Sequence, residues 1–385
     1  MKKNIAILGS TGSIGRSTVS LVEKNIKNFN IILLSTNKNI KLIDKQCKKL
    51  KPKYLVIKDY TSYVKFKKKN KVKKIKVFNN YNFLSQIIKK KLDYAMSAIS
   101  GFDGLEPTLK IIPFTKVIAI ANKESLICAW NLISNKLKKF KTKFIPVDSE
   151  HFSIFSLINN SSKNIEKIYI TASGGPFLNI KKKKLKNIKP SDAIKHPRWN
   201  MGKKISIDSA TLINKVFEIL EAKKIFSLEL NKFEILTHPD SYVHAIVKFQ
   251  NGLTKILVHD TDMKIPIYNS IYENKIYKTS SLDLNKLNNF KFQKVDLKQF
   301  PSIKIIDNFK NVRNSLYETV LVSANDELVD LFLKKKITFL EISEKLIMIM
   351  NLSEFKKMKS IKPKKFSQIS FLNKYVRLKT RSLCV

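Results

Sequence analysis

Two acidic side chains follow an apolar run in the segment PVDSEHF, residues 146–152. Asp148 and Glu150 are two positions apart, so on extended backbone both side chains point to the same face. Two carboxylates on one face repel each other unless a cation lies between them, and hard oxygen ligands suit Mg²⁺ or Mn²⁺. Taken alone, such a pair is more often solvated surface, and the neighbouring His151 is more often structural than a ligand. The pair therefore indicates a metal site only if other residues support it.

A third carboxylate can join the pair from HPRWNMGKKISIDSATLINKVFEILEA, residues 196–222. The first half of this segment has no periodicity and predicts a structured loop, whereas the second half predicts a helix over residues 209–226. Asn214 and Glu218 are four apart and share one face of that helix. Glu218 can therefore reach a metal ion, while hydrogen bonds to a phosphate group would come from Ser209, Asn214 and Lys215. Taken singly, each of these is more simply an ordinary exposed helix residue.

Two shorter segments add groups of the same kind. TASGGPF, residues 171–177, supplies Ser173 and two glycines after a predicted strand, which suits a turn around a phosphate. ANKES, residues 121–125, ends a buried strand, where ligands of parallel sheets usually bind. Trp199 is one of only two tryptophans, and core packing explains it as well as ligand contact does.

Glycine is scarce in this chain, and six of its nine glycines lie in three short segments. The loop GSTGSIG, residues 9–15, follows the apolar run NIAIL and opens a helix at Arg16–Ser17. Its glycines permit a tight turn and close approach of backbone N–H groups to a pyrophosphate, and the helix N-terminus adds partial positive charge. A plain strand–helix turn rarely needs three glycines in so short a stretch. The loop therefore predicts dinucleotide binding.

The end of the second predicted strand indicates which dinucleotide binds. It reads IILLSTNKN, in which Lys38 and Asn39 suit a ribose 2′-phosphate. No Asp or Glu, which NAD-specific sites place here for the ribose hydroxyls, is nearby in the sequence. One lysine is weak support in a lysine-rich chain, so NAD stays the alternative to the predicted NADP.

These segments need a framework, and the apolar pattern predicts one in three parts. Over residues 1–149 short apolar runs alternate with helical patterns, which predicts a doubly wound parallel sheet. These runs are NIAILG, FNIILLS, YLVIKD, YAMSAIS, VIAIAN and KFIPVD. Over residues 150–290 the pattern is mixed, with strands predicted at IEKIYITAS, FEILTHP, SYVHAIVKF and LTKILVH, the last two antiparallel.

The remaining residues predict a linker and helices. Residues 291–311 look irregular and include Pro301, so they predict a linker, and residues 312–385 predict a small helical domain. The fold class is thus α/β, with an N-terminal Rossmann-like doubly wound parallel sheet, a central α+β catalytic domain and a small C-terminal helical domain.

Composition excludes several classes of protein. The 385 residues suggest more than one domain, and no apolar run approaches the ~18 residues that a membrane span needs. The three cysteines are scattered and odd in number, so neither a disulfide framework nor a zinc site is expected, and a reduced cytoplasmic setting fits. The net charge of +44 would normally suggest nucleic acid, but lysine runs occur all along the chain without interleaved aromatic residues. We therefore expect neither a nucleic-acid nor a membrane partner.

Taken together in this order, the motifs become specific. GSTGSIG, ANKES, PVDSEH, SGGPF, WNMGKKISIDSATLINK and EILEA resemble the 1-deoxy-D-xylulose 5-phosphate reductoisomerase family, and SANDEL at residues 323–328 resembles its late AANE-type segment. The resemblance runs from residue 1 to the C-terminal helices. It implies rearrangement and reduction of 1-deoxy-D-xylulose 5-phosphate to 2-C-methyl-D-erythritol 4-phosphate in non-mevalonate isoprenoid precursor synthesis. It also implies NADPH, Mg²⁺ or Mn²⁺ with Co²⁺ as an alternative, a small phosphorylated sugar as substrate, and a homodimer.

The resemblance also implies roles for individual residues. The metal ligands would be Asp148, Glu150 and Glu218, which together with Lys123 form the catalytic set. The substrate would contact Lys123, Ser149, Glu150, Ser173, His196, Trp199, Ser209, Asn214, Lys215 and Glu218, with Trp199 and Met201 in a mobile flap. The cofactor would contact Gly9, Ser10, Thr11, Gly12, Ser13, Ile14, Gly15, Asn37, Lys38, Asn39, Asn122, Glu124, Gly202 and Met263, the last near the nicotinamide. The chain departs from the family pattern at Arg198 and Asn37, and neither departure removes a group that the chemistry needs.

Three alternatives stay open at this point. Another NADP-dependent two-domain reductase, such as a semialdehyde dehydrogenase, would need an activated cysteine, and no cysteine here has a neighbouring histidine. A basic nucleic-acid-binding protein would show salt-dependent binding to duplex DNA. A decayed enzyme would have lost ligands, yet every proposed ligand position carries a competent side chain.

Overall fold

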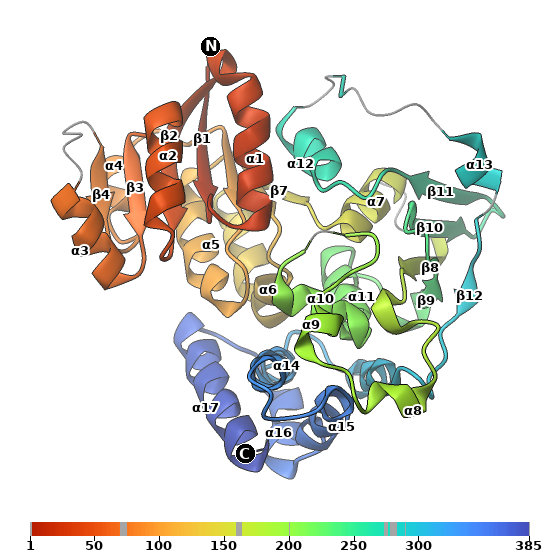
Figure 1. Cartoon of the computed structure of the whole chain (residues 1–385). Coiled ribbons are helices and arrows are strands. Elements are labelled where there is room, and N and C mark those ends of the chain that lie inside the picture. Colours follow the sequence, from red (N-terminus) through yellow and green to blue (C-terminus); the bar gives the residue numbers. More distant parts are fainter. Residues whose placement is uncertain are drawn as a thin grey trace. The chain divides into compact units, whose positions relative to one another are not determined.

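The computed structural model describes residues 2–69, 75–158, 164–199, 201–272, 276–277, 283–288 and 290–384. The chain forms two compact units (Figure 1). The first contains Met1–Ser125, Leu132–Asp148 and Met263–Tyr277, and the second contains Leu126–Asn131, Ser149–Asp262 and Lys278–Val385. None of the described helices combines the length and the apolar character needed to cross a membrane.

The first unit is built on a seven-stranded sheet in the order β4-β3-β2-β1-β5-β6-β7, and every neighbouring pair is parallel. Its strands are β1 Lys3–Leu8, β2 Phe29–Thr36, β3 Tyr54–Ile57, β4 Lys76–Phe78, β5 Tyr94–Ser97, β6 Val117–Ile120 and β7 Lys143–Pro146. The chain adds β2 to β4 on one side of β1 and then returns to add β5 on the other side. That reversal between β1 and β5 is where doubly wound sheets bind ligands. The predicted α/β fold with a Rossmann-like N-terminal sheet is confirmed, and only the short β4 was missed.

Helices connect these strands, as parallel pairing requires. They are α1 Ser13–Lys24, α2 Ile40–Leu50, α3 Tyr60–Lys69, α4 Leu84–Ile87, α5 Leu105–Ile111 and α6 Lys123–Lys139, with α12 Lys264–Ile271 added from later in the chain. Short 3-10 helices lie at Ile26–Asn28, Phe102–Gly104 and Ile112–Phe114. Helix α1 begins at Ser13, earlier than the predicted start at Arg16, so Gly15 lies inside its first turn.

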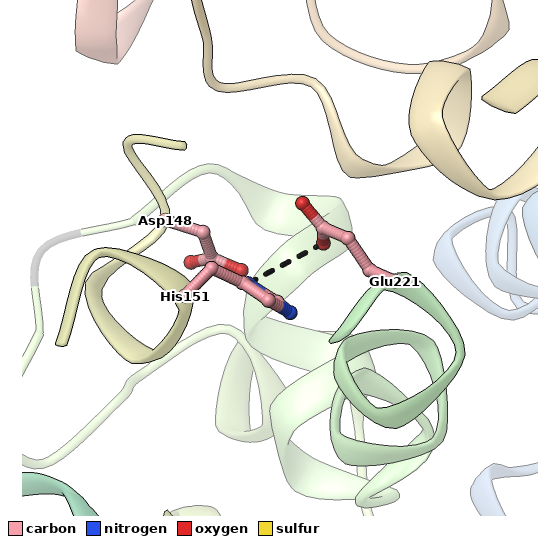
Figure 2. Close-up of side chains that lie close together, drawn as sticks. All are labelled: Asp148, His151 and Glu221. Carbon is pink, nitrogen blue, oxygen red and sulfur yellow. Dashed lines mark ion pairs between the residues drawn. The ribbon is translucent and has the colours of Figure 1, made fainter. Parts of the chain in front are cut away.

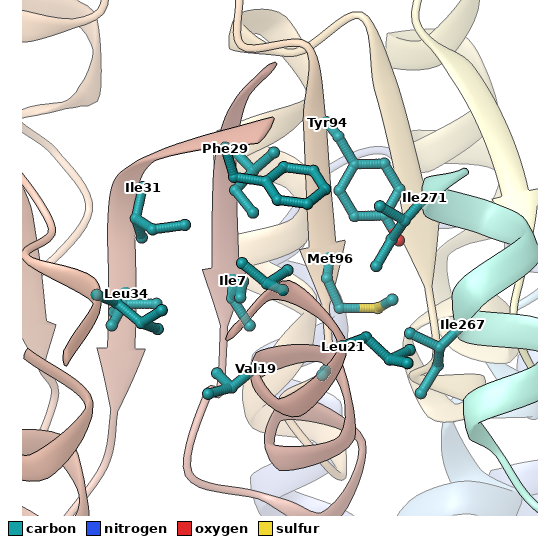
Figure 3. Packing of buried hydrophobic residues seen from close by; sticks show 14 of the residues in the cluster. Ile7, Val19, Leu21, Phe29, Ile31, Leu34, Tyr94, Met96, Ile267 and Ile271 are labelled. Carbon is teal, nitrogen blue, oxygen red and sulfur yellow. The ribbon is translucent and has the colours of Figure 1, made fainter. Parts of the chain in front are cut away.

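A hydrophobic cluster holds α12 in the first unit. Ile267 and Ile271 of α12 belong to the same buried cluster as Ile7 of β1 and Val19 of α1 (Figure 3). Burial of such side chains stabilises by ~1.5–3 kcal/mol each. The Tyr94 and Ser270 hydroxyls add a buried hydrogen bond of 2.7 Å. The predicted boundaries placed residues 263–277 in the central domain, whereas the structure groups them with the N-terminal sheet, because packing and not chain order decides membership.

The second unit contains a five-stranded sheet in the order β11-β10-β8-β9-β12. Its strands are β8 Ile165–Ala172, β9 Phe233–Thr237, β10 Val243–Phe249, β11 Thr254–Val258 and β12 Gln293–Lys294. β10 is antiparallel to both β8 and β11, as predicted for the last two strands, while β8 and β9 are parallel. Residues 291–311, predicted as an irregular linker, contain β12 and a 3-10 helix at Pro301–Phe309.

Some helices of the second unit pack against this sheet, and those nearest the C-terminus pack against one another. The helices of this unit are α7 Ser149–Ile158, α8 Lys182–Leu185, α9 Pro190–Ala193, α10 Lys203–Ala210, α11 Ile213–Ile225, α13 Leu284–Asn288, α14 Tyr317–Leu333, α15 Phe339–Met350, α16 Ser353–Lys356 and α17 Phe366–Cys384. Further 3-10 helices lie at Gly175–Phe177, Leu230–Lys232 and Lys357–Ser360. Residues 312–385 are helical as predicted, but they group with residues 149–262 in one unit.

The single helix predicted over residues 209–226 is wrong. α10 ends at Ala210, and α11 begins at Ile213 after Leu212 in a left-handed conformation (φ 58°). A left-handed Leu costs roughly 1–2 kcal/mol, so its surroundings must hold it there. Leu212 is buried, and the Ser302 hydroxyl binds the Thr211 carbonyl at 2.5 Å. Ser209 therefore lies in the last turn of α10 and not on the helix that carries Glu218.

Candidate active site

The loop after β1 has the backbone geometry that close approach to a ligand needs. Gly9 has a φ of 78°, and a Cβ there would lie 2.7 Å from the carbonyl oxygen of Ala98, just after β5. The Ser10 backbone N–H donates to Ser35 O at 2.9 Å, and the hydroxyls of Thr11 and Thr36 lie 2.7 Å apart. No side chain caps α1 and no acidic residue lies in its first turn. A helix terminus of this kind can bind an anion, as the sequence predicts for the dinucleotide pyrophosphate.

Gly15 is required by packing. A Cβ on Gly15 would lie 2.1 Å from the carbonyl oxygen of Gly9, whereas one on Gly12 would meet its nearest atom at 3.4 Å. The helix can therefore approach the loop closely only if residue 15 is glycine.

We expect Gly15→Ala to lower the free energy of unfolding by about 2–3 kcal/mol, because overpacking against fixed backbone forces a shift. The same shift should weaken dinucleotide binding at least tenfold. Urea denaturation and NADPH titration measure the two effects. Gly12→Ala is the matched control for stability, and equal destabilisation by both variants would contradict the assignment.

The residues after β2 lead into helix α2, and the predicted cofactor contacts of Lys38 and Asn39 stay predictions. Asn39 caps α2 by accepting from the Leu42 backbone N–H at 3.1 Å, and Lys38 precedes it in the turn. Asp59, from the turn after β3, donates its backbone N–H to Asn37 O at 3.3 Å. The pKa of Asp59 is lowered, mainly by its hydrogen bonds with Ser62 and also by the Lys38 charge. The sequence showed no acid near Lys38, but folding brings one there.

The ANKES segment begins α6. Asn122 is its N-cap: its side chain accepts from the Ser125 backbone N–H at 2.6 Å and donates to Gly101 O at 2.7 Å. The structure thus gives Asn122 a structural role, and its predicted cofactor contact stays a prediction, as does that of the buried Glu124. Lys123 is also buried, and its Nζ lies 3.1 Å from Asp148 Oδ2.

The predicted metal ligands come together. Asp148, Glu150 and Glu218 each offer a carboxylate oxygen, and these oxygens all lie within 4.8 Å of one another. Asp148 is joined to Ser149 by one peptide bond, so its place beside α7 follows from the chain itself. The expected reason was wrong, because Glu150 lies in the first turn of helix α7 and not on extended backbone. Asp148 and Glu150 are brought together because the chain passes from β7 into α7 at this point, and not because side chains alternate along a strand.

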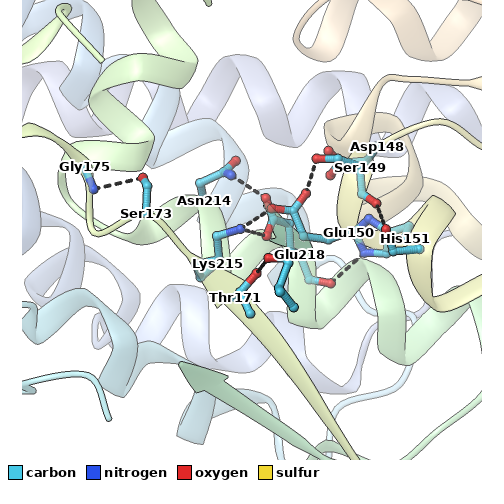
Figure 4. A network of polar contacts seen from close by, with 12 residues as sticks. Asp148, Ser149, Glu150, His151, Thr171, Ser173, Gly175, Asn214, Lys215 and Glu218 are labelled. Carbon is cyan, nitrogen blue, oxygen red and sulfur yellow. Dashed lines mark hydrogen bonds and ion pairs between the residues drawn. The ribbon is translucent and has the colours of Figure 1, made fainter. Parts of the chain in front are cut away.

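Lys215 lies among these carboxylates (Figure 4). Its Nζ is 2.5 Å from Glu150 Oε1 and 2.5 Å from Glu218 Oε2. Burial favours the neutral amine, but the two carboxylates outweigh it and raise the pKa of Lys215. Asn214 donates its side-chain N–H to Glu218 Oε1, and the Ser149 hydroxyl donates to Glu150 Oε2 at 2.6 Å. One lysine thus pairs with two buried carboxylates, so the cluster still carries excess negative charge and would attract a further cation.

His151 and Glu221 lie close to Asp148, with their ligand atoms within 4.8 Å of one another (Figure 2). The His151 Nε2–H donates to the Glu218 backbone carbonyl at 2.9 Å, and its Nδ1 lies 3.6 Å from Glu221 Oε2. The ring therefore ties α7 to α11, the two helices that carry Glu150 and Glu218. This contact suits a structural role, but Asp148, His151 and Glu221 also form a group that could hold a metal ion, so the expectation for His151 stays a prediction.

The phosphate candidates all belong to the second unit, and some of them are in contact. The Ser173 hydroxyl lies 2.9 Å from His196 Nε2 and accepts from the Gly175 backbone N–H at 3.1 Å. Burial and then the Lys215 charge lower the pKa of His196 to about 4, so its ring is neutral at neutral pH. A Cβ on Gly175 would lie 2.9 Å from the carbonyl oxygen of Ser209, so the glycine turn packs directly against the end of α10. Ser173 therefore meets His196 directly, and the turn after Ser173 meets the end of α10, where Ser209 lies.

The predicted flap precedes α10. The backbone N–H groups of Arg198 and Trp199 both donate to His196 Nδ1, at 3.1 and 2.9 Å. Arg198 pairs with Asp240 at 2.6 Å on the surface, which accounts for this departure from the family pattern. Gly202 is the N-cap of α10 with a φ of −68°, and a Cβ would meet nothing within 4 Å. The backbone therefore does not need glycine at 202, unlike at 9 and 175.

Met263 belongs to the first unit. It is the N-cap of α12 and packs against the cluster that contains β1 and α1. This places it in the unit of the glycine loop, and its predicted contact with the nicotinamide stays a prediction.

Sequence reasoning missed three side chains near the carboxylates. Glu221, one turn after Glu218, faces His151. His244 and His259 stack with ring centroids 3.8 Å apart, and Trp199 meets His244 edge-on at 5.9 Å. The scarcity of histidine, five in the whole chain, was the signal that could have drawn attention to the pair.

The cysteines do not support the semialdehyde dehydrogenase alternative. Cys47 and Cys128 are buried, and burial raises the pKa of Cys47 to about 12 and also raises that of Cys128. The pKa of Cys384 is raised as well, again mainly by burial. A nucleophilic cysteine needs the opposite shift.

A glycine loop at the reversal of a doubly wound sheet and a buried carboxylate cluster define the class of dinucleotide- and metal-dependent α/β enzymes. Three family models match the chain: 1-deoxy-D-xylulose 5-phosphate reductoisomerase at residues 5–130, its C-terminal domain at residues 144–226, and the DXP reductoisomerase C-terminal domain at residues 259–379. The chain belongs to the 1-deoxy-D-xylulose 5-phosphate reductoisomerase family.

Individual relatives agree with this assignment. The 1-deoxy-D-xylulose 5-phosphate reductoisomerase of Pelagibacter ubique (strain HTCC1062) is 58% identical, with all of both chains covered. That of Wolbachia pipientis subsp. Culex pipiens (strain wPip) is 40% identical over 89% of this chain and 88% of the relative. Among solved structures, the Zymomonas mobilis reductoisomerase in complex with NADPH matches with a TM-score of 0.89 and 32% identity, covering 100% of this chain and 99% of the other. A DOX-P reductoisomerase in complex with NADPH, fosmidomycin and magnesium matches with a TM-score of 0.90 and 28% identity, covering 99% and 98%.

Proposed function

We propose that this chain converts 1-deoxy-D-xylulose 5-phosphate to 2-C-methyl-D-erythritol 4-phosphate with NADPH and a divalent metal, in non-mevalonate isoprenoid precursor synthesis. One observation carries the proposal. Helix α11 presents Asn214, Lys215 and Glu218 together, so phosphate donors and a metal-type carboxylate share one helix face. Such a face suits a short molecule with oxygen ligands at one end and a phosphate at the other. The complexes of the relatives with NADPH and magnesium support the same reaction.

The carboxylate cluster fits a divalent cation. It offers three hard oxygen donors, two of them on buried residues. The negative charges of Glu150 and Glu218 already raise the pKa of the neighbouring Lys215. Asp148, Glu150 and Glu218 would hold Mg²⁺ or Mn²⁺, with Co²⁺ as an alternative. When bound, the ion polarises a ketone and the adjacent hydroxyl oxygen, and NADPH supplies the hydride that reduces the rearranged aldehyde.

The chain's own residues bind and orient the substrate. Its phosphate group would be held by Ser173, His196, Ser209, Asn214 and Lys215. Because His196 Nδ1 accepts from the Arg198 and Trp199 backbone, a neutral His196 would donate to the phosphate from Nε2 without adding charge, and Lys215 would supply the positive charge for the dianion. Because the phosphate is remote from the reacting bonds, its binding energy can orient the ketone and close the flap.

The remaining residues complete the proposed site. Lys123 and Ser149 contact the substrate beside the carboxylates, and Trp199 and Met201 close over it and exclude water. The cofactor would contact Gly9, Ser10, Thr11, Gly12, Ser13, Ile14, Gly15, Asn37, Lys38, Asn39, Asn122, Glu124, Gly202 and Met263. We also propose a homodimer in the cytoplasm, where the three free cysteines would stay reduced.

The test is NADPH oxidation followed by its near-ultraviolet absorbance with 1-deoxy-D-xylulose 5-phosphate as substrate. We expect oxidation with Mg²⁺ or Mn²⁺ and none after chelation with EDTA. Protein that binds NADPH but shows no metal-dependent oxidation would contradict the proposed substrate while leaving the dinucleotide site intact.

A further inference from the structure

Two histidines outside the proposed site residues form a stacked pair. His244 lies on β10 and His259 directly follows β11, and their ring planes differ by only 20°. The His259 backbone N–H donates to Tyr242 O at 3.1 Å. In return, the Nε2 atom of His244 lies 3.2 Å from the backbone carbonyl oxygen of His259. The antiparallel pairing of β10 with β11 therefore holds both rings in place.

The hydrogen bonds define the tautomer of each ring. A carbonyl oxygen only accepts, so His244 carries its proton on Nε2. His259 Nδ1 lies 2.7 Å from Asp260 O, so His259 carries its proton on Nδ1. Burial lowers the pKa of His244 to about 3 and also lowers that of His259, so both rings are neutral at neutral pH. His259 Nε2 is consequently a hydrogen-bond acceptor.

That acceptor finds no donor in the part of the chain that the structure describes. Among the residues that the structure describes, His259 Nε2 is buried and makes no hydrogen bond. A buried polar atom without a partner costs ~1–3 kcal/mol, so a bound molecule that donates a hydrogen bond to it would recover that free energy.

The pair adjoins the proposed substrate site. Trp199 of the flap contacts the His244 ring, and the charge of Glu150 acts on both histidines. Lys215 acts on His244 from the phosphate side. A substrate bound beside the carboxylates, Lys215 and the flap is therefore the nearest candidate donor for His259 Nε2.

We propose that His259 Nε2 accepts a hydrogen bond from a hydroxyl group of the bound sugar phosphate and so helps to select a hydroxylated substrate. This inference rests on the proposed function. A neutral acceptor distinguishes a hydroxyl from a hydrogen or a methyl group at that position, because only the hydroxyl satisfies the buried nitrogen. His244 supports the ring from behind and is a positioning residue in this arrangement.

The test uses two variants that separate the acceptor from the ring. His259→Phe keeps a flat ring against His244 and loses the acceptor, whereas His259→Gln keeps a side-chain oxygen near the position of Nε2. We expect His259→Phe to raise KM for 1-deoxy-D-xylulose 5-phosphate about tenfold with kcat and NADPH affinity within twofold, and His259→Gln to restore most of the loss. A merely structural role would lower stability without this division between KM and kcat.

Substrate analogues identify the contact itself. We expect one of the two analogues lacking the C3 or the C4 hydroxyl to bind the wild-type enzyme about tenfold more weakly than the substrate, and to bind His259→Phe no more weakly than the substrate does. Unchanged KM in His259→Phe, or a rise only in the NADPH requirement, overturns the inference. Absence of turnover by the wild type instead rejects the proposed function, so the two failures are distinguishable.

Discussion

Glu218→Gln is expected to lower kcat on the order of a thousandfold while leaving the NADPH dissociation constant within twofold. Glu218 is 1% exposed, and its two oxygens contact Asn214 and Lys215 beside Glu150. Glutamine has the same shape but no charge, so it removes one of three anionic donors and weakens metal binding. A loss of ~4 kcal/mol in transition-state stabilisation corresponds to this factor.

Steady-state kinetics over a range of Mg²⁺ concentrations measure the effect, together with a separate NADPH titration. Glu234→Gln is the matched control, because Glu234 lies on β9 in a surface pair with Lys167 at 3.7 Å. If Glu218→Gln loses NADPH affinity to the same degree as activity, Glu218 contacts the cofactor and its assignment as a metal ligand is wrong.

Lys215→Met is expected to lower the free energy of unfolding by ~3–5 kcal/mol in EDTA, because two buried carboxylates lose their counter-charge. The raised pKa of Lys215 reflects that mutual attraction. Divalent cations should then stabilise the variant more than the wild type, since a bound ion replaces the missing positive charge. KM for the sugar phosphate should rise at the same time, because the phosphate loses its cation.

Lys224→Met is the matched control. Lys224 forms another buried pair in the second unit, with Glu318 at 2.7 Å, away from the three carboxylates. We expect a similar loss of stability in EDTA but no extra gain from Mg²⁺. Thermal unfolding with EDTA and with Mg²⁺ compares the two variants, and equal Mg²⁺-dependent shifts would show that the gain does not depend on the Lys215 cluster.

The strand pattern and the glycine loop were predictable because they depend on local physical chemistry. Apolar runs of a few residues separated by helical patterns predict a parallel sheet, and the six runs proposed are β1, β2, β3, β5, β6 and β7. Gly9 and Gly15 stand where a Cβ would meet backbone atoms at 2.7 and 2.1 Å. The i, i+4 spacing of Asn214 and Glu218 likewise places them on one helix face.

Helix boundaries and unit membership were not predictable in the same way. The break at Leu212 leaves hydrophobic periodicity unchanged, because residues on both sides remain buried. Asp148 and Glu150 share a face through a strand–helix junction, although their spacing equally fits a strand. Residues 263–277 follow the second unit in sequence but pack with the first, since α12 completes its hydrophobic cluster.

The sequence by itself determined which functional groups the site contains: three carboxylates, a lysine, donors for a phosphate and a glycine loop. Each of them lies in a short contiguous motif. Only the tertiary structure decided which of these meet. Lys215 lies between Glu150 and Glu218, His151 ties their helices together, and the His259 Nε2 acceptor is buried without a hydrogen-bond partner among the described residues. Apart from the Lys215–Glu218 pair on one helix, these contacts join residues far apart in the chain, and the packing of α7, α11 and β10–β11 sets their distances, which no local pattern encodes.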